Sequence, residues 1–163
     1  MTVRDAQGVY RMWVANPALM GPLNMPARNL SAQVIAQQIN GFDDRARYLV
    51  GVFAKVPQAQ IGVILIDVTP VHALAKISAF LGDRNWWGKR VFEEAGPILI
   101  DHFFEERGIE KITAQVWTGN MPILVPLRRL GFQIEGRLRQ EIKAFDGSGR
   151  RDQFVLGLLK PAA

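Results

Sequence analysis

The spacing of apolar residues predicts two helices at the start of the chain. Residues 2–5 have the hydroxyl and carboxylate spacing of a helix start, and Val9 and Trp13 follow at helical spacing. A loop rich in proline and glycine ends this segment. Ser31 is the expected N-cap of a second helix, with Ile35 on its apolar face.

The rest of the chain is dominated by strand patterns. Strands are expected over residues 48–54, 61–68, 74–81, 112–117, 134–143 and 154–159. A long helical period runs from Val91 to Gly108, and a short helix is expected over residues 120–130. Three strands before the long helix favour an α/β fold of the α+β type, with one mixed sheet flanked by helices. The 163 residues fit a single domain, residues 1–163.

Composition removes several classes of function. The chain has no cysteine, which excludes disulfides, thiolate metal sites and cysteine nucleophiles. His72 and His102 are the only imidazoles, so no metal site is expected. The first residues lack the apolar core of a signal peptide, and no apolar run approaches the roughly 20 residues that span a bilayer. We therefore expect a cytoplasmic protein without a membrane partner.

The net charge of +5 has two interpretations. Seven basic residues and three acidic residues lie between Arg128 and Arg151. Such an excess is compatible with a surface that binds nucleic acid or an acidic protein. It is equally compatible with a solvated strand face of mixed charge. The alternation of charged and apolar residues over 134–143 favours the second interpretation and argues against nucleic acid as a partner.

Candidate chemistry begins at the end of the third strand, in the segment LGDRNWWGKRVFEEA, residues 81–95. A strand ends at Gly82, and a helix begins near Gly88. The first amides of a helix have no intrahelical partner and lie at its positive pole, so they can bind a pyrophosphate. Lys89 and Arg90 add two full charges beside them. Glycine loops before helices are common, so this segment alone does not establish a phosphate site.

A second segment strengthens that interpretation. Asn120 is followed by Leu130-Gly131-Phe132 and then by Glu135-Gly136-Arg137 and Arg139. In order and spacing, these motifs and the 81–95 loop resemble the ribosomal-protein-type branch of the GNAT N-acetyltransferase superfamily. The resemblance covers residues 30–160. It implies the GNAT acyl-CoA N-acyltransferase fold, with a splayed central sheet, and acetyl-coenzyme A as co-substrate.

The resemblance also implies a set of functional residues. The expected cofactor-binding residues are Phe80, Leu81, Trp87, Gly88, Lys89, Arg90, Val91, Phe92 and Asn120. The backbone of Phe80 and Leu81 would pair with pantetheine, and the amides from Gly88 to Phe92 would hold the pyrophosphate. Asn120 would lie beside the thioester, although it could also act as a helix cap. Trp86 and Trp87 would stack on adenine, line the acceptor cleft, or anchor the loop to the core.

Several residues depart from the family pattern. Arg90 and Phe92 stand where the branch has small residues, so either they block the phosphate or Arg90 pairs with it. Leu127 replaces a tyrosine general acid, and Lys76 replaces a glutamate. Pro97 and Pro126 fall inside the expected helices and should kink them. Because only Met1 precedes the first helix signal, we expect no counterpart of the family's first strand in this sequence.

The loss of the glutamate restricts the acceptor. Deprotonating a lysine-like ammonium at pH 7 costs about 4.6 kcal/mol, whereas an α-amine costs about 1 to 1.4 kcal/mol. We therefore expect an N-acetyltransferase acting on a primary amine, such as a protein N-terminus or a small amine. Asp67 is the candidate for a base acting through water, with His72 as a second candidate. The alternative is a non-catalytic GNAT-fold binding protein, and a homodimer is left open.

Overall fold

The computed structural model describes residue 1 and residues 6–162, so the helix start expected over 2–5 lies outside the described residues. The six strands are β1 (Arg47–Ala54), β2 (Ala59–Thr69), β3 (Leu74–Leu81), β4 (Lys111–Trp117), β5 (Gln133–Lys143) and β6 (Arg150–Leu159). The α-helices are α2 (Arg11–Val14), α3 (Pro17–Met20), α4 (Ala32–Asn40), α5 (Val91–Asp101) and α6 (Met121–Arg129). The remaining helical segments of the described residues are two π-helical segments, η1 (Ala6–Tyr10) and η5 (His102–Glu106), and three 3₁₀ helices, η2 (Gly21–Leu23), η3 (Pro70–His72) and η4 (Arg84–Trp86).

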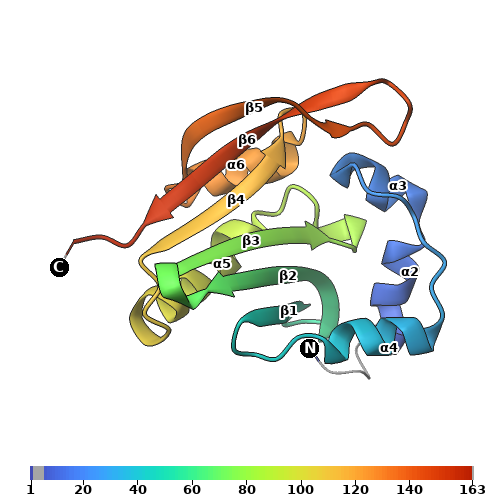
Figure 1. Ribbon diagram of the computed structural model, residues 1–163. Coiled ribbons are helices and arrows are strands. Elements are labelled where there is room, and N and C mark those ends of the chain that lie inside the picture. Colours follow the sequence, from blue (N-terminus) through green and yellow to red (C-terminus); the bar gives the residue numbers. More distant parts are fainter. Residues whose placement is uncertain (2–5, 163) are drawn as a thin grey trace.

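The strands form one mixed sheet in the order β1-β2-β3-β4-β6-β5. Every neighbouring pair is antiparallel except β3 and β4, which are parallel. The crossover between these two strands contains α5, as a parallel connection requires. The expected mixed sheet flanked by helices is confirmed (Figure 1).

Two apolar layers cover the sheet. The larger core lies between the sheet and helices α5 and α6, and its fully buried side chains include Phe103, Phe132 and Leu156. On the other face Ile35 and Ile39 of α4 pack against Leu49 and Val63 of the sheet. These layers follow from the predicted apolar faces, since every second strand residue points to the same side of the sheet.

Local signals account for several helix ends. The Ser31 hydroxyl accepts a hydrogen bond from the amide of Val34 at 3.3 Å, so the predicted N-cap is confirmed. Gly131 has φ +94° after α6, the left-handed conformation expected of a glycine that ends a helix. Helices α5 and α6 continue through Pro97 and Pro126 without interruption.

Within residues 1 and 6–162, no helix is long and apolar enough to cross a membrane. The same residues contain no cluster of three histidine, aspartate or glutamate side chains that could hold a metal ion.

Candidate functional site

The sheet opens between β3 and β4. Their parallel pairing covers only four residue pairs, from Leu74–Lys111 to Ile77–Ala114. Beyond these pairs, residues 78–81 of β3 and 115–117 of β4 have no partner in each other. Figure 1 shows the two arrows diverging toward their carboxyl ends. The central sheet is therefore splayed, and the gap exposes the backbone edges of both strands.

A cavity of about 560 Å³ lies at this opening. Its walls come from the end of β3, the loop before α5, the first turn of α5, helix α6 and the α3–η2 segment. Of the predicted cofactor-binding residues, it is lined by Phe80, Leu81, Trp87, Gly88, Arg90, Val91, Phe92 and Asn120. The sequence motifs thus converge on one cavity. Lys89 is the exception: it is exposed, and its ammonium lies 5.2 Å from the centre of the Trp86 ring.

The loop before α5 presents the start of that helix to the cavity. Gly88 and Arg90 both have left-handed backbones, with φ of +75° and +56°. Arg90 is the N-cap residue, and no side chain caps the first amides of α5. These amides, at the positive end of the helix, are thus available to an anion. The left-handed conformation at Arg90 explains in physical terms why glycine suits this position, since it costs other residues about 1–2 kcal/mol.

The two bulky replacements in this loop have different environments. Arg90 is exposed at the cavity wall. Phe92 is half-buried and packs against the main core. The side chain of Phe92 therefore serves the hydrophobic core as well as lining the cavity. Arg90 retains a solvent-accessible guanidinium beside the helix start.

The tryptophans anchor the loop. The indole nitrogen of Trp87 donates to the carbonyl of Leu81 at 3.1 Å, which ties the loop to the end of β3. Trp86 packs against the main core. Of the alternatives considered for this pair, anchoring has direct support in these contacts. The Trp87 bond also occupies one lone pair of the Leu81 carbonyl, a group expected to pair with pantetheine.

Asn120 stands immediately before α6 and is only 8% exposed. Its backbone carbonyl accepts from the amide of Leu124 at 3.0 Å, which starts the helix. Asn120 is therefore the N-cap residue of α6, but its side chain makes no capping hydrogen bond. Its backbone, with φ −85° and ψ 64°, lies outside the extended region typical of residues whose side chains cap a helix. Asn120 also lines the cavity.

Asp67 does not reach the cavity. It forms an exposed ion pair with Arg47 at 3.2 Å and lies opposite Lys76 in the β2–β3 register. Lys76 is four residues from Phe80, which is about 13 Å along a strand. Antiparallel register therefore places Asp67 toward the closed end of the β3–β4 gap. The structure gives this carboxylate no contact with the cavity, so we do not retain it as a base.

His72 and Lys76, which also lie near the closed end, do not line the cavity either. His72 lies in η3, before β3 begins. Lys76 donates from Nζ to Oε1 of Gln115 on β4 at 2.9 Å, close to the point where the two strands part. This hydrogen bond therefore joins β3 and β4 through two exposed side chains.

No sequence pattern indicated that the α3–η2 segment (residues 17–23) forms part of the site. Leu19, Pro22 and Leu23 of this segment line the cavity. Its position depends on long-range contacts. The carbonyl of Pro22 accepts from the indole nitrogen of Trp117 at 2.8 Å, and the carbonyl of Ala18 accepts from Arg84 at 3.0 Å.

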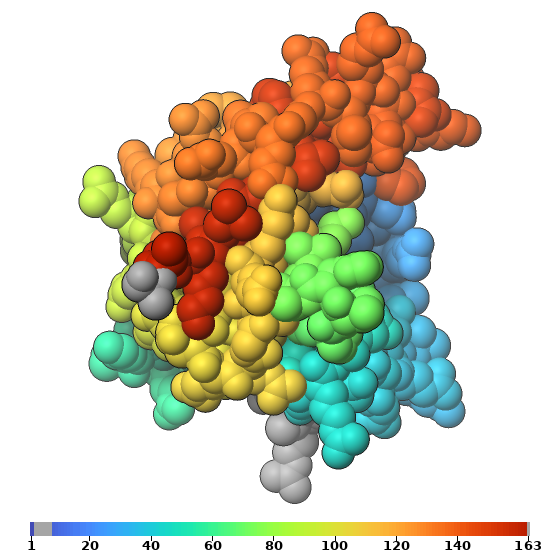
Figure 2. Space-filling view, turned by 60° about the vertical axis from the view of Figure 1, so that its left-hand side comes forward, coloured from blue at the N-terminus to red at the C-terminus, as the bar shows by residue number. Residues whose placement is uncertain are grey.

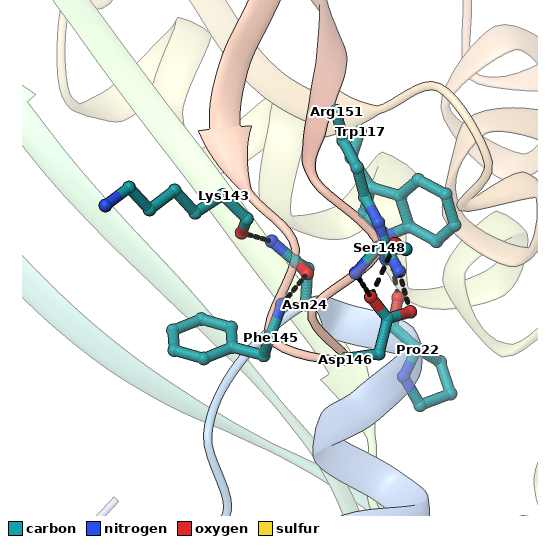
Figure 3. A network of polar contacts seen from close by, with 8 residues as sticks. All are labelled: Pro22, Asn24, Trp117, Lys143, Phe145, Asp146, Ser148 and Arg151. Atoms are coloured by element: carbon teal, nitrogen blue, oxygen red, sulfur yellow. Dashed lines mark hydrogen bonds and ion pairs between the residues drawn. The ribbon is translucent and has the colours of Figure 1, made fainter.

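Asn24 attaches the end of this segment to the β5–β6 hairpin (Figure 3). Its side chain donates to the carbonyl of Lys143 at 2.8 Å and accepts from the amide of Phe145 at 3.1 Å. In the same network, Arg151 pairs with Asp146 and lies over the ring of Trp117, 4.5 Å from its centre. In the space-filling view the hairpin stands out from the body of the molecule (Figure 2). These contacts hold the turn end of the hairpin against the segment that forms part of the cavity wall.

A second set of missed residues belongs to α6 and to the first turn of α5. Arg129 and Glu93 both line the cavity and form an ion pair at 2.9 Å. The Glu93 side chain is 17% exposed and the Arg129 side chain is 55% exposed. Helical spacing places Arg129 beyond Asn120, Ile123 and Pro126 on one face of α6, and all four line the cavity.

Comparison with known proteins gives consistent matches. The family model described as acetyltransferase (GNAT) domain matches residues 1–133. An uncharacterized N-acetyltransferase, p20, of Bacillus licheniformis is 41% identical over 87 residues, which is 53% of this chain and 47% of that protein. The chain therefore spans about half the length of this relative.

Solved structures share the fold at low sequence identity. A ribosomal L7/L12 α-N-protein acetyltransferase in complex with coenzyme A has a TM-score of 0.86 and 16% identity, covering 98% of this chain and 90% of that chain. A spermidine N-acetyltransferase from Vibrio cholerae, in complex with coenzyme A and spermine, has a TM-score of 0.80 and 19% identity, covering 92% and 87%. With a family model that matches most of its length, and with the sheet opening described above, this chain belongs to the GNAT acetyltransferase family.

Proposed function

We propose that the protein transfers the acetyl group of acetyl-coenzyme A to a primary amine, and that the preferred amine is a peptide or protein N-terminus. The observation that carries the proposal is the cavity at the β3–β4 opening, which combines an apolar wall with the uncapped start of α5. An acyl-coenzyme A has matching parts, since a flexible arm carries the thioester and a pyrophosphate carries negative charge.

The phosphate end is assigned to the start of α5. The amides of Val91, Phe92 and Glu93 lie in the first turn, where a helix favours an anion. Arg90 and Arg129 line the same region and supply two cations. The pantetheine arm would then extend past Phe80 and Leu81 toward the point where β3 and β4 part.

The charges at the cavity support an α-amine as acceptor. Glu93 is the one carboxylate among the described residues that line the cavity, and Arg129 already pairs with it. A site with no free carboxylate base suits an amine that loses its proton readily. An α-amine costs about 3 kcal/mol less to deprotonate at pH 7 than a lysine side chain.

Catalysis would rest on positioning. The neutral amine attacks the carbonyl carbon of the thioester, the carbon–sulfur bond breaks, and the thiolate takes the proton that the new amide loses. The side-chain amide of Asn120 is assigned to the thioester end, where it can donate to the developing oxyanion. Holding both reactants in one cavity lowers the activation barrier further, because the amine and the thioester are already oriented for attack.

The test uses three acceptors with acetyl-coenzyme A and follows release of the free thiol. The acceptors are a lysine-free peptide with a free N-terminus, an N-acetylated peptide with one lysine, and spermidine. At pH 7 we expect kcat/KM for the free N-terminus to exceed both others by several hundredfold, from the difference in deprotonation cost. Equal efficiency for the lysine peptide or spermidine would refute the α-amine assignment. Binding of acetyl-coenzyme A without turnover on any acceptor would favour a non-catalytic binding protein.

A further inference from the structure

A second, smaller cavity lies beneath the point where β3 and β4 part. Its volume is about 40 Å³, and it lies between the sheet and helices α5 and α6. Its walls are entirely apolar and include Ile77, Ala79, Phe92, Ile123, Pro126 and Leu127. One water needs about 10–15 Å³ on this measure together with two or more polar partners. The cavity is large enough for a water molecule but offers it no polar partner, so the space suits a small apolar group.

The small cavity continues the large one. Phe92, Ile123 and Pro126 line both. Along β3, Phe80 and Leu81 line the large cavity, whereas Ile77 and Ala79 line the small one. The small cavity is therefore farther along the path assigned to the pantetheine arm. It lies on the side where the strands converge and where the thioester would end.

Leu127 contributes to this space. It is 7% exposed and lines the small cavity from α6. Its branched aliphatic side chain brings no polar atom into the cavity. A phenylalanine at this position would be larger and would extend an aromatic ring into the void. The volume next to the proposed thioester position thus depends on the size of residue 127.

We propose that the small cavity is a subsite for the acyl tail and that the protein prefers propionyl-coenzyme A to acetyl-coenzyme A. This inference rests on the proposed function, because it assigns the thioester to the same cavity. One additional buried methylene should tighten binding by about fourfold. The preference would come from burial alone, since the walls offer the tail no hydrogen bond.

Isothermal titration calorimetry of the full chain with coenzyme A, acetyl-coenzyme A and propionyl-coenzyme A tests this assignment without an acceptor. We expect the Kd for propionyl-coenzyme A to be about fourfold lower than that for acetyl-coenzyme A. Equal or weaker binding of the propionyl thioester, with acetyl-coenzyme A still bound, would overturn the inference and leave the proposed function intact. A failure of all three ligands to bind would overturn the proposed function itself.

Three variants test where the acyl tail binds. Leu127→Phe should remove the preference for propionyl-coenzyme A by filling the cavity, whereas Leu127→Met conserves volume and should keep it. Ala79→Val narrows the cavity from β3 and gives the same test if Leu127→Phe fails to fold. A fourfold preference that persists in a folded Leu127→Phe or Ala79→Val protein would place the acyl tail elsewhere.

Discussion

Arg129 of α6 donates from Nη1 to the Glu93 carboxylate of α5 at 2.9 Å, so one ion pair joins the two helices at the cavity wall. Glu93 lies in the first turn of α5, close to the amides assigned to the pyrophosphate. The pair therefore positions a guanidinium beside the phosphate end. More than half of the Arg129 side chain remains accessible, so its other donors can reach a ligand.

Replacing Arg129 should affect binding more than stability. Partly exposed ion pairs contribute at most about 1 kcal/mol to folding, whereas a hydrogen bond to a charged group is worth about 1.5–3 kcal/mol. We expect Arg129→Gln to raise the Kd for acetyl-coenzyme A at least about tenfold in calorimetry. Arg128→Gln is the matched control, because Arg128 is an exposed neighbour that does not line the cavity. Equal effects of the two substitutions would remove Arg129 from the phosphate site.

Arg90 combines an unfavourable backbone with a useful charge. Its φ of +56° suits glycine, so Arg90→Gly should leave the free energy of unfolding unchanged or raise it by up to about 1 kcal/mol. Losing the guanidinium should nevertheless weaken binding of acetyl-coenzyme A several-fold. Arg90→Ala removes the charge without relieving the backbone, and should weaken binding equally while lowering stability relative to Arg90→Gly. Tighter binding by Arg90→Gly would mean that the arginine obstructs the phosphate.

Asn24 connects the cavity wall to the hairpin through two hydrogen bonds, and it is 7% exposed. Asn24→Ala should lower the free energy of unfolding by about 2 kcal/mol, since each lost bond is worth about 1 kcal/mol. Amide hydrogen exchange should accelerate at Phe145 and its neighbours in the hairpin. Asn16→Ala is a suitable comparison, because the Asn16 side chain bonds only to the local amide of Ala18. Unchanged exchange in the hairpin of Asn24→Ala would show that other contacts hold it.

Asp43 gives the fold a dependence on acidic pH. Its carboxylate accepts from the backbone amides of Arg47, Arg45 and Ala46, which lowers its pKa from 3.8 to about 2. Because the pKa of Asp43 is lower in the folded state than in the unfolded state, its ionised carboxylate stabilises the fold above about pH 4. This stabilisation is lost as the pH falls toward 2. Asp43→Asn keeps an acceptor oxygen without the charge, so it should reduce the loss of stability between pH 5 and pH 2.5. Denaturant titrations at both pH values give the comparison. Identical pH dependence in the two proteins would contradict this role.

Local patterns predicted the elements well because the signals are contained within a few residues. The third strand has the predicted bounds, and the second strand extends the predicted range by only one or two residues at each end. The cavity-lining part of the 81–95 loop was found because a strand end, a glycine and a helix start occur together. These features depend on backbone geometry that the local sequence determines.

Features set by distant contacts could not be predicted. Leu19 and Leu23 reach the cavity because the α3–η2 segment and the adjoining Asn24 are fixed by Trp117 and Lys143, which lie 95 and 119 residues further along the chain than their partners. The alternating pattern of β5 conceals two irregularities in its pairing with β6, and Gln140 has φ +52° where a regular strand was expected. Its amide instead donates to Asp152, a partner on the other strand.

The most direct test of the account is calorimetric titration of the protein with acetyl-coenzyme A, with Gly88→Val as a comparison. Gly88 has φ +75° at the cavity wall, a conformation that a β-branched residue strongly disfavours. We expect one acetyl-coenzyme A per chain for the unmodified protein and much weaker binding for a folded Gly88→Val variant. Absence of binding by the unmodified protein, or equal binding by the two, would contradict the claim that the β3–β4 opening and the start of α5 form the coenzyme site.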